Sequence, residues 1–286
     1  MQLATATKVR AAGILSRAVS TARRLAGRSP STVVCTRGGL TWSLNLQDGI
    51  QLSIYLFGAF ERATVRTLSR LLPRGGVAID VGANIGAHTL PMARHAGEAG
   101  RVIAVEPTAW AVGGLRRNLE LNADVAPRVI VHAAALVAPG EPLAREYYSS
   151  WPLADAQRPH AIHRGVLHST AGSVALTLDE LVAREKLPRL DVVKIDVDGQ
   201  ELRVLRGAMA TLASLRPSLV VELTPYALGE QGDSIDDLLD LLSQAQYRLV
   251  DERSFTPLSS DRDTLLRMMP AGGSINVVAL PVERQV

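Results

Sequence analysis

A glycine-rich turn and a nearby carboxylate are the most informative residues of this chain. Residues 77–86 read VAIDVGANIG, a short apolar run that leads directly into the turn. A second apolar run, residues 101–105, ends at Glu106. Glycine lets a ligand approach the backbone closely because it has no side chain, and a carboxylate at the tip of the next strand can accept both hydroxyls of a ribose. The pattern predicts a site for a cofactor that contains a nucleoside.

The turn does not have the spacing of a dinucleotide site. A G-x-G-x-x-G pattern begun at Gly82 needs glycine where Asn84 stands, and the chain has no G-x-x-x-x-G-K-[ST] phosphate loop. Instead Asp80 precedes Gly82 and Gly86. A carboxylate there would repel a pyrophosphate but suits a cationic amino-acid tail or a sulfonium. S-adenosylmethionine carries both positive groups and is the predicted cofactor, while NAD, ATP and a turn without a ligand are the alternatives.

A second group of charged residues follows another apolar run, in the segment LDVVKIDVDG at residues 190–199. In a strand with a period of two, Lys194 and Asp196 share a face, and Asp198 lies in the turn beyond. Ligands of open α/β sheets bind outside the carboxyl ends of the strands. The sequence places four carboxylates at or near such ends, more than packing explains: Asp80, Glu106, Asp196 and Glu222.

The elements that must position these residues alternate between strands and helices. Strands are expected at 77–81, 101–105, 128–132, 191–195, 217–222, 247–250 and 275–280, and helices at 61–72, 86–97, 108–122, 178–186, 200–214 and 234–245. This alternation, with strands rich in Val and Ile, predicts a mostly parallel sheet with helices on both faces. The last two strands could form an antiparallel hairpin at the end of the sheet. Upstream, residues 40–46 and 50–57 are expected to be two strands around an Asp48-Gly49 turn.

Composition limits the class of protein. At 286 residues and 47% hydrophobic, the chain is long enough for one large, soluble α/β domain, and no stretch of it is apolar enough to span a membrane. Its single cysteine, Cys35, excludes an intrachain disulfide framework and a cysteine-based zinc site. We therefore expect a protein of the reducing cytoplasm. A net charge of +3 and 4% aromatic residues do not indicate a nucleic-acid partner.

Two segments depart from the pattern. Residues 1–47 contain seven Lys or Arg and no acid, and residues 1–35 are expected to be a basic helical segment preceding one domain at 36–286. A solvated helix is the favoured interpretation there, with a transit peptide or contact with an anionic membrane as alternatives.

The interval 139–172 holds three of the six histidines and several aromatic residues. A long irregular stretch is usually functional or disordered, and the aromatic residues and histidines favour a lid or wall over a substrate.

Taken together, these residues resemble the FkbM family of S-adenosylmethionine-dependent methyltransferases. The resemblance covers about residues 40–250 and includes the stretches WSL at 42–44, FGAFE at 57–61, IDVGANIG at 79–86, VEP at 105–107, NLELN at 118–122, TLDE at 177–180, KIDVDG at 194–199 and VLRGA at 204–208. Asp198 stands where the family usually has Glu. The resemblance implies a Rossmann-like class I methyltransferase sheet of seven strands with a reversed last pair. It also implies O-methylation of a sugar or polyketide hydroxyl in a secondary metabolite or glycolipid.

Within this hypothesis each residue has a role. The methionine end of the cofactor would lie at Asp80 and the turn, with the ribose at Glu106 beside Pro107. Backbone near Ala133 and Ala134 would face the adenine. The full set of expected cofactor residues is Asp80, Gly82, Ala83, Asn84, Gly86, Glu106, Pro107, Ala133, Ala134 and Asp196.

Removal of the acceptor proton needs a base, and general-base help accelerates such a step by roughly 10²–10⁴. The candidates are Asp196 and His168, with Lys194 and Glu222 as further catalytic residues. Glu222 could orient Lys194, the acceptor or a metal. A magnesium ion at Asp196 and a neighbouring acid is an open alternative, and we predict no metal. His88 is expected to serve packing or to support the residues that contact the ligand.

The expected partner is a small hydroxylated molecule, with S-adenosylhomocysteine as the product of the cofactor, and a homodimer is an open alternative. Three other hypotheses concern the activity. The chain could methylate a macromolecule, it could bind the same cofactor for chemistry other than methylation, or it could be a scaffold that has lost its chemistry. Intact acids at all four strand ends argue against the last.

Overall fold

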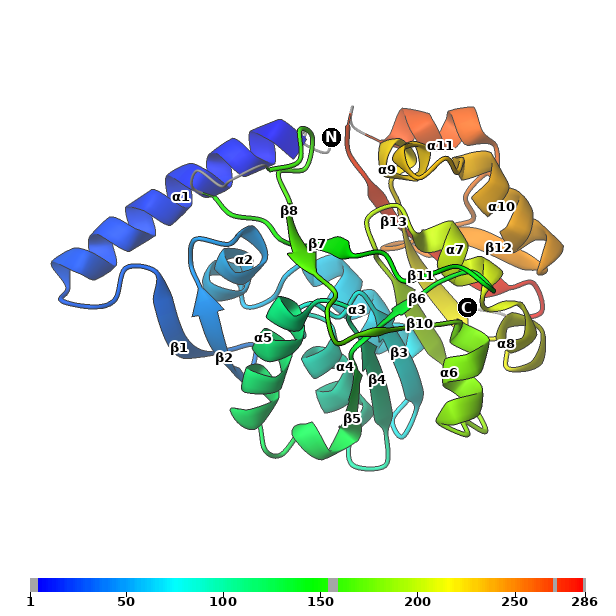
Figure 1. Ribbon diagram of the computed structural model, residues 1–286, viewed down its shortest axis with the longest axis horizontal. Helices are drawn as coiled ribbons and strands as arrows, with labels where there is room; N and C mark the ends of the chain where they lie inside the picture. The colour runs from blue at the N-terminus through cyan, green and yellow to red at the C-terminus, as the bar shows by residue number, and fades with distance from the viewer. Residues whose placement is uncertain (1–4, 154–158, 270–271, 285–286) are drawn as a thin grey trace.

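A seven-stranded sheet forms the centre of the molecule (Figure 1). The computed structural model describes residues 5–153, 159–269 and 272–284. The strands of this sheet are β3 (Val77–Val81), β4 (Arg101–Val105), β5 (Val129–His132), β10 (Val192–Ile195), β11 (Ser218–Leu223), β12 (Tyr247–Asp251) and β13 (Ile275–Pro281). They lie in the order β12-β13-β11-β10-β3-β4-β5. Only β13 runs against its neighbours, so the predicted parallel sheet with a reversed last pair is confirmed.

Helices cover both faces of the sheet, as the alternation predicts. They are α2 (Gly49–Phe57), α3 (Arg62–Leu71), α4 (Thr89–Ala96), α5 (Ala109–Glu120), α6 (Leu178–Arg184), α7 (Glu201–Arg206), α8 (Met209–Ser214), α9 (Pro225–Glu230), α10 (Ile235–Gln244) and α11 (Arg262–Met268), with a 3₁₀ turn at Ala126–Arg128. One face packs against α2 to α5 and the other against α6 to α11. The sheet is therefore buried on both sides, which is why its strands are apolar throughout.

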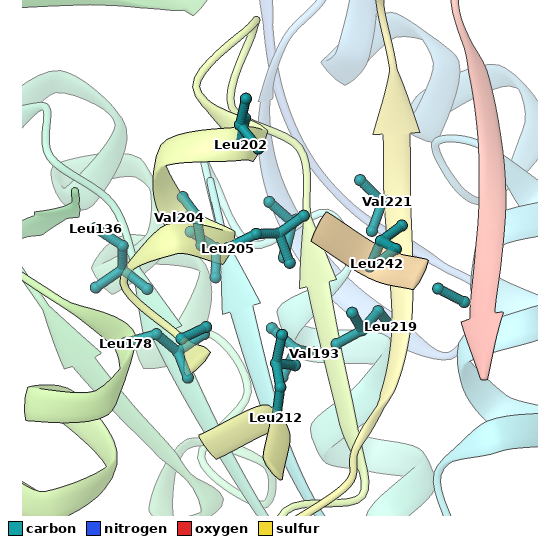
Figure 2. Close-up of a cluster of buried hydrophobic side chains, with 14 of the residues drawn as sticks. Leu136, Leu178, Val193, Leu202, Val204, Leu205, Leu212, Leu219, Val221 and Leu242 are labelled. Atoms are coloured by element: carbon teal, nitrogen blue, oxygen red, sulfur yellow. The ribbon is translucent and has the colours of Figure 1, made fainter. Parts of the chain in front are cut away.

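Each face of the sheet has its own hydrophobic core. On the α6 to α11 side, alternate residues of β10 and β11 meet leucines and valines from the helices. Figure 2 shows this cluster, which includes Leu136, Leu178, Val193, Leu202, Val204, Leu205, Leu212, Leu219, Val221 and Leu242. Complete burial of one such side chain contributes about 1.5–3 kcal/mol. These two cores hold the ends of the strands in place, and the strand ends carry the candidate site.

The expected strand at residues 50–57 is wrong, because this segment forms helix α2. The Asp48 side chain accepts a hydrogen bond from the backbone N–H of Gln51 and caps the helix, and Gly58 ends it in a left-handed conformation with φ 84°. The strand at 40–46 is confirmed as β2 (Leu40–Asn45), but its partner is the upstream β1 (Thr32–Arg37). An apolar run of this length does not by itself distinguish a buried helix from a strand.

The expected helix at 200–214 is broken in two at Gly207, between α7 and α8. A Cβ at Gly207 would overlap the carbonyl oxygen of Val137, so the backbone approaches a neighbouring segment closely there. The interval 139–172 is less irregular than expected, because β7 (Glu146–Ser150) and β8 (Val166–Ser169) pair in an antiparallel hairpin. A short parallel pair, β6 (Ala134–Leu136) and β9 (Val174–Leu176), flanks it.

The first element of the described residues is the 21-residue helix α1 (Thr5–Leu25), which lies at the edge of the molecule next to α2 (Figure 1). Its sequence carries arginines in the last turn and no acid in the first. Among the helices of the described residues, none is both long enough and apolar enough to cross a bilayer.

Candidate active site

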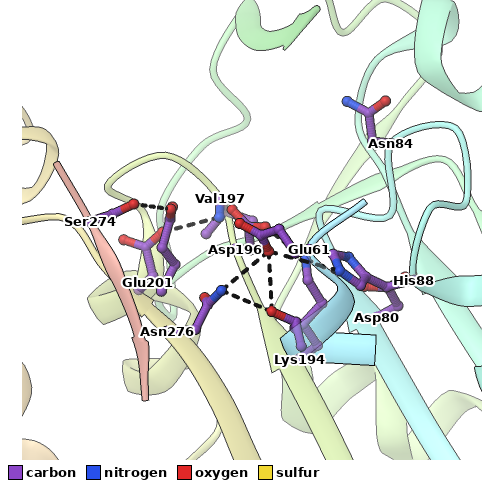
Figure 3. Close-up of polar contacts among 12 residues, drawn as sticks. Glu61, Asp80, Asn84, His88, Lys194, Asp196, Val197, Glu201, Ser274 and Asn276 are labelled. Carbon is purple, nitrogen blue, oxygen red and sulfur yellow. Dashed lines mark hydrogen bonds and ion pairs between the residues drawn. The ribbon is translucent and has the colours of Figure 1, made fainter. Parts of the chain in front are cut away.

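The buried ion pair of Lys194 is the centre of the site. Neighbouring parallel strands place Lys194 in direct register with Asp80. The Lys194 ammonium donates to Asp196 Oδ2 at 2.9 Å and lies 3.8 Å from Asp80 Oδ1 (Figure 3). The predicted shared face of Lys194 and Asp196 is therefore confirmed.

The opposite charges of Lys194 and Asp196 keep both side chains ionised. Burial disfavours the charged ammonium, but the carboxylates of Asp196 and Asp80 outweigh it and raise the pKa of Lys194. Burial likewise opposes ionisation of Asp196, but the Lys194 ammonium holds the pKa of this carboxyl below its ordinary value. Asp196 is therefore a carboxylate at neutral pH, and its side chain is 26% exposed.

Asp80 lies beneath the site. Its side chain is fully buried, and Oδ2 accepts a hydrogen bond from Thr89 Oγ1 at 2.6 Å, while Oδ1 has no hydrogen-bond partner among the described residues. Burial raises the pKa of Asp80 although the Lys194 ammonium opposes the shift. Because Asp80 is buried, it would act on a ligand indirectly, by holding Lys194 and the turn above it in place.

The glycine-rich turn has the geometry that its sequence predicts. Gly82 and Gly86 have φ values of 80° and 91°, and Asn84 also adopts the left-handed region with φ 48°. A Cβ on Gly82 would overlap the carbonyl oxygen of Asp196, and one on Gly86 would overlap leucine side chains. Glycine is required at both positions because left-handed backbone and close approach both disfavour a side chain.

Glu106 receives hydrogen bonds from three segments. Its Oε2 accepts from the backbone N–H of Asn84 at 3.0 Å, and its Oε1 accepts from the N–H and Oγ1 of Thr108 at 3.0 and 2.7 Å. Ser149 of β7 also donates to Oε1, at 3.3 Å. Burial raises the pKa of Glu106 even though these donors oppose it. Since a carboxylate oxygen can accept two bonds, Oε2 retains capacity for a ligand hydroxyl.

A first cavity of about 300 Å³ opens over this turn. Gly82, Ala83, Asn84, Glu106 and Pro107 form one wall, and Lys194, Asp196 and Asp198 form another. The opposite side comes from the 139–172 interval, through Tyr147, Tyr148, Trp151 and Leu167. Seven of the predicted cofactor and catalytic residues thus share one cavity.

A second cavity of about 290 Å³ adjoins the first and shares Ile50, Phe60, Trp151, Asp196 and Asp198 with it. Its other walls carry Glu61, Glu222, Thr224, Tyr226, His163 and Arg164. Glu222 accepts a hydrogen bond from Ser274 Oγ at 2.5 Å. Burial and the charge of Asp196 raise the pKa of Glu222 well above its ordinary value.

The turn after β10 is held by a buried acid. Glu201 is fully buried, and its Oε1 accepts the backbone N–H groups of Val197 and Gly199 at 3.0 and 3.2 Å. Asp198 in this turn has φ 49°, and a Cβ on Gly199 would overlap the backbone of Ala227. The turn therefore presents Asp198 to both cavities in a fixed conformation.

Glu61 is a residue of the site that no catalytic motif in the sequence predicts. It lies ahead of α3 with φ 43° and accepts a hydrogen bond from Asn276 Nδ2 at 3.2 Å (Figure 3). Burial, followed by the charge of Asp196, raises its pKa to about 7. Its position in the FGAFE stretch of the resemblance was the only signal, because no spacing links it to residues 135 positions away.

His88 is packed as expected, but its ring also reaches the first cavity. Its Nε2 lies 3.9 Å from Glu61 Oε2, and the ring lies tilted against Phe60. Burial and the nearby Lys194 ammonium lower the pKa of His88 to about 3, so the imidazole is neutral. A neutral ring can be placed beside a lysine ammonium without charge repulsion.

Five of the predicted residues line neither cavity: Asp80 and Gly86 lie beneath and within the turn, and His168, Ala133 and Ala134 lie elsewhere. His168 bonds to Ser150 Oγ at 2.8 Å and stacks on Trp110 of α5, because strand alternation in β8 sends Leu167 to the cavity and His168 away from it. Ala133 and Ala134 are outside the lining of both cavities. Their backbone is already paired, with Val174 N–H donating to Ala133 and Ala134 N–H donating to Glu106.

Metal ions in proteins are commonly held by clustered His, Cys, Asp and Glu side chains. Among the residues that the structure describes, no group of three or more such side chains has an arrangement that could hold a metal ion.

Comparison with known proteins adds relatives to this geometry. The chain is 29% identical over 212 residues to hexuronic acid methyltransferase AglP of Haloferax volcanii. This match covers 72% of this chain and 76% of AglP. The chain is 29% identical over 166 residues to methyltransferase 1 of Beauveria bassiana, covering 53% and 66%. A solved structure of methyltransferase FkbM from Methylobacillus flagellatus aligns with a TM-score of 0.42 at 16% identity, covering 76% of this chain and 58% of that one.

The decisive match is to a family. Residues 80–249, more than half of the chain, match the family model described as the methyltransferase FkbM domain. The match begins at Asp80 and includes the turn, Glu106, Lys194, Asp196 and Glu222. This chain is an enzyme of the transferase class and belongs to the FkbM-domain methyltransferase family.

Proposed function

We propose that this protein transfers a methyl group from S-adenosylmethionine to a hydroxyl of a small, sugar-containing molecule. The observation that carries the proposal is the wall shared by the two cavities. Asp196 and Asp198 line both of them. A group transfer needs two ligands that meet at one point with their reacting atoms about 3 Å apart, and the shared wall is where ligands of the two cavities would meet.

The first cavity suits the cofactor. Bound there, S-adenosylmethionine would supply an electrophilic methyl group on its sulfonium. The free capacity of Glu106 Oε2 suits a ribose hydroxyl, and the glycine turn allows close approach of the ligand to the backbone. Asp196 and Asp198 would face the positive end of the ligand, where carboxylates favour a cation.

Asp196 is our candidate general base. It stays ionised beside Lys194, it is partly exposed, and it lines the cavity on the acceptor side as well. As the acceptor oxygen attacks the methyl group, its proton would pass to the Asp196 carboxylate. Glu222 and Glu61, whose pKa values are raised, would donate or accept hydrogen bonds with other hydroxyls of the acceptor. His168 is not part of this mechanism because its ring lies against Trp110.

The second cavity suits a sugar. Aromatic faces of Trp151 and Tyr226 supply apolar surface, while Glu61 and Glu222 supply convergent polar groups. Ligand sites commonly combine an apolar lining with a few placed polar groups. Thr224 Oγ1 in this wall is buried and has no hydrogen-bond partner among the described residues. The relative from Haloferax volcanii is named for methylation of a hexuronic acid, which supports an acceptor of this class.

Calorimetric titration with S-adenosylhomocysteine tests the cofactor, with NAD and ATP as controls. We expect micromolar binding of S-adenosylhomocysteine alone. Glu106→Gln keeps an oxygen for Thr108 but removes the negative charge, so we expect binding to weaken by roughly 10–100-fold. Equal binding of NAD, or no binding by a folded sample, would contradict this part of the proposal.

Methyl transfer from labelled S-adenosylmethionine to a set of free sugars, uronic acids and glycolipids tests the acceptor. Tyr226 lines only the second cavity. We therefore expect Tyr226→Ala to raise the KM of the acceptor while leaving the affinity for S-adenosylhomocysteine unchanged. Label that appears only in protein or RNA would overturn the small-molecule acceptor and leave the cofactor assignment standing.

A further inference from the structure

Helix α1 presents two different faces along its length. Its inner face packs on the rest of the chain, where Ser16 Oγ donates to the carbonyl of Leu46 at 2.9 Å and Ser20 Oγ to that of Pro30 at 3.0 Å. Val19 packs against the core on the same side. Figure 1 shows the helix along the edge of the molecule.

The outer face is mostly apolar, with exposed polar exceptions such as Thr7, where a solvated helix would be polar. Ile14 is 61% exposed and Leu25 is 85% exposed. At 100° per residue these side chains share one face, together with the exposed Ala11, Leu15, Ala18 and Ala22. A surface helix ordinarily places charged residues on the side away from the core.

A row of arginines borders this apolar face. Arg10, Arg17 and Arg24 are spaced by seven residues and are all exposed. No acidic side chain of the described residues forms a salt bridge with any of them. The first 47 residues contain seven Lys or Arg and no acid, whereas the remaining 24 Lys and Arg are outnumbered by 28 acids. The positive charge is therefore concentrated at this edge.

We propose that the outer face of α1 docks on an anionic bilayer. An apolar helical face bordered by arginines is the arrangement that lies in the interface of a membrane, with the apolar side chains among the acyl chains and the cations at the headgroups. Charge complementarity selects this occupant, because a second copy of the chain would bring the same unpaired arginines together.

Docking would also orient the enzyme. Ala12, on the inner side of α1, lines the second cavity. A bilayer under the outer face would therefore lie one helix diameter from the cavity that we assign to the acceptor, within reach of a lipid-linked acceptor. The docking itself does not depend on the proposed activity, and its test needs no turnover.

Co-sedimentation of the full chain with vesicles tests the proposal. We compare vesicles of phosphatidylcholine alone with vesicles that also contain phosphatidylglycerol. We expect binding only to the anionic vesicles, with a steep decline as salt is raised. Each basic residue near an anionic surface changes the partition coefficient about fivefold, so the triple variant Arg10→Gln, Arg17→Gln, Arg24→Gln should lose roughly 100-fold.

Two further variants make the result specific. Ile14→Ser with Leu25→Ser removes exposed apolar surface, so it should leave the melting temperature unchanged and weaken vesicle binding. The matched control Arg101→Gln, Arg116→Gln, Arg117→Gln removes three exposed arginines from β4 and α5 and should bind as the wild type does. Absence of wild-type binding, or equal loss in the control, would overturn the proposal. The proposal would also be overturned if the protein formed a dimer in solution and the double variant Ile14→Ser, Leu25→Ser dissociated it. The outer face of α1 would then bind a second copy of the chain.

Discussion

Lys194 donates to Asp196 at 2.9 Å while standing in register with Asp80 on the neighbouring strand. One buried cation thus serves two acids of unequal exposure. Asp80 is sealed beneath the sheet edge, whereas Asp196 reaches both cavities. Lys194 therefore both neutralises the buried Asp80 within the sheet and keeps Asp196, the candidate base, ionised.

Removal of this cation should destabilise the fold. Lys194→Met leaves Asp80 and Asp196 without their counter-ion, and a broken buried pair costs about 3–5 kcal/mol. We expect a loss of this order in urea unfolding. In the double variant with Asp80→Asn, the amide oxygen can still accept from Thr89, so part of the loss should return. A single variant as stable as the wild type would show that Lys194 does not neutralise the pair.

Asp196→Asn should separate chemistry from binding. The amide cannot take the proton of the acceptor, so kcat for methyl transfer should fall by roughly 10²–10⁴, while the affinity for S-adenosylhomocysteine changes less than about tenfold. Steady-state kinetics with the acceptor from the screen measure the first quantity, and calorimetry the second. Asp236→Asn, which alters an exposed acid paired with Arg262, is the matched control. A fall below about tenfold in kcat would exclude Asp196 as the base.

Glu201 should make stability depend on pH. Burial raises its pKa to about 7 from an ordinary value of 4.5. Between these values the folded state binds more protons than the unfolded state, so the unfolding free energy falls as pH rises through this window. Glu201→Gln keeps an oxygen for Val197 and Gly199 but cannot ionise. Between about pH 5 and pH 8 the wild type should lose roughly 1–3 kcal/mol more than the variant. Parallel profiles in urea unfolding would show that the Glu201 carboxyl does not titrate in this window.

Gly82→Ala should disrupt the turn. Residue 82 has φ 80°, and the added Cβ would overlap the backbone of Asp196. The left-handed backbone and the overlap together should cost roughly 2–4 kcal/mol. Gly113→Ala is the matched control, because Gly113 lies in α5 with nothing near its Cβ position. It should be stabilising by about 0.5–1 kcal/mol. Thermal unfolding measures both, and equal effects would contradict the role of Gly82.

Local pattern was sufficient for most of the sheet. The predicted strands of the seven-stranded sheet each lie within one residue of the observed bounds, because apolar runs bounded by turn residues fix a buried strand locally. The segment 50–57 shows where this stops. Its apolar residues fit either a strand or a buried helix. The N-cap made by Asp48 and packing against the core favour the helix α2.

The sequence by itself determined that glycines and carboxylates gather at one edge of the sheet, since parallel strands bring their carboxyl ends to the same edge. Only the tertiary structure decided how they are used. Packing buried Asp80 and left Asp196 partly exposed. The pairing of β7 with β8 turned His168 toward Trp110, and the loop before α3 brought Glu61 to the same site. Sequence periodicity reports the local environment of a side chain, whereas these contacts join segments far apart in the chain, and only the packed core sets their distances.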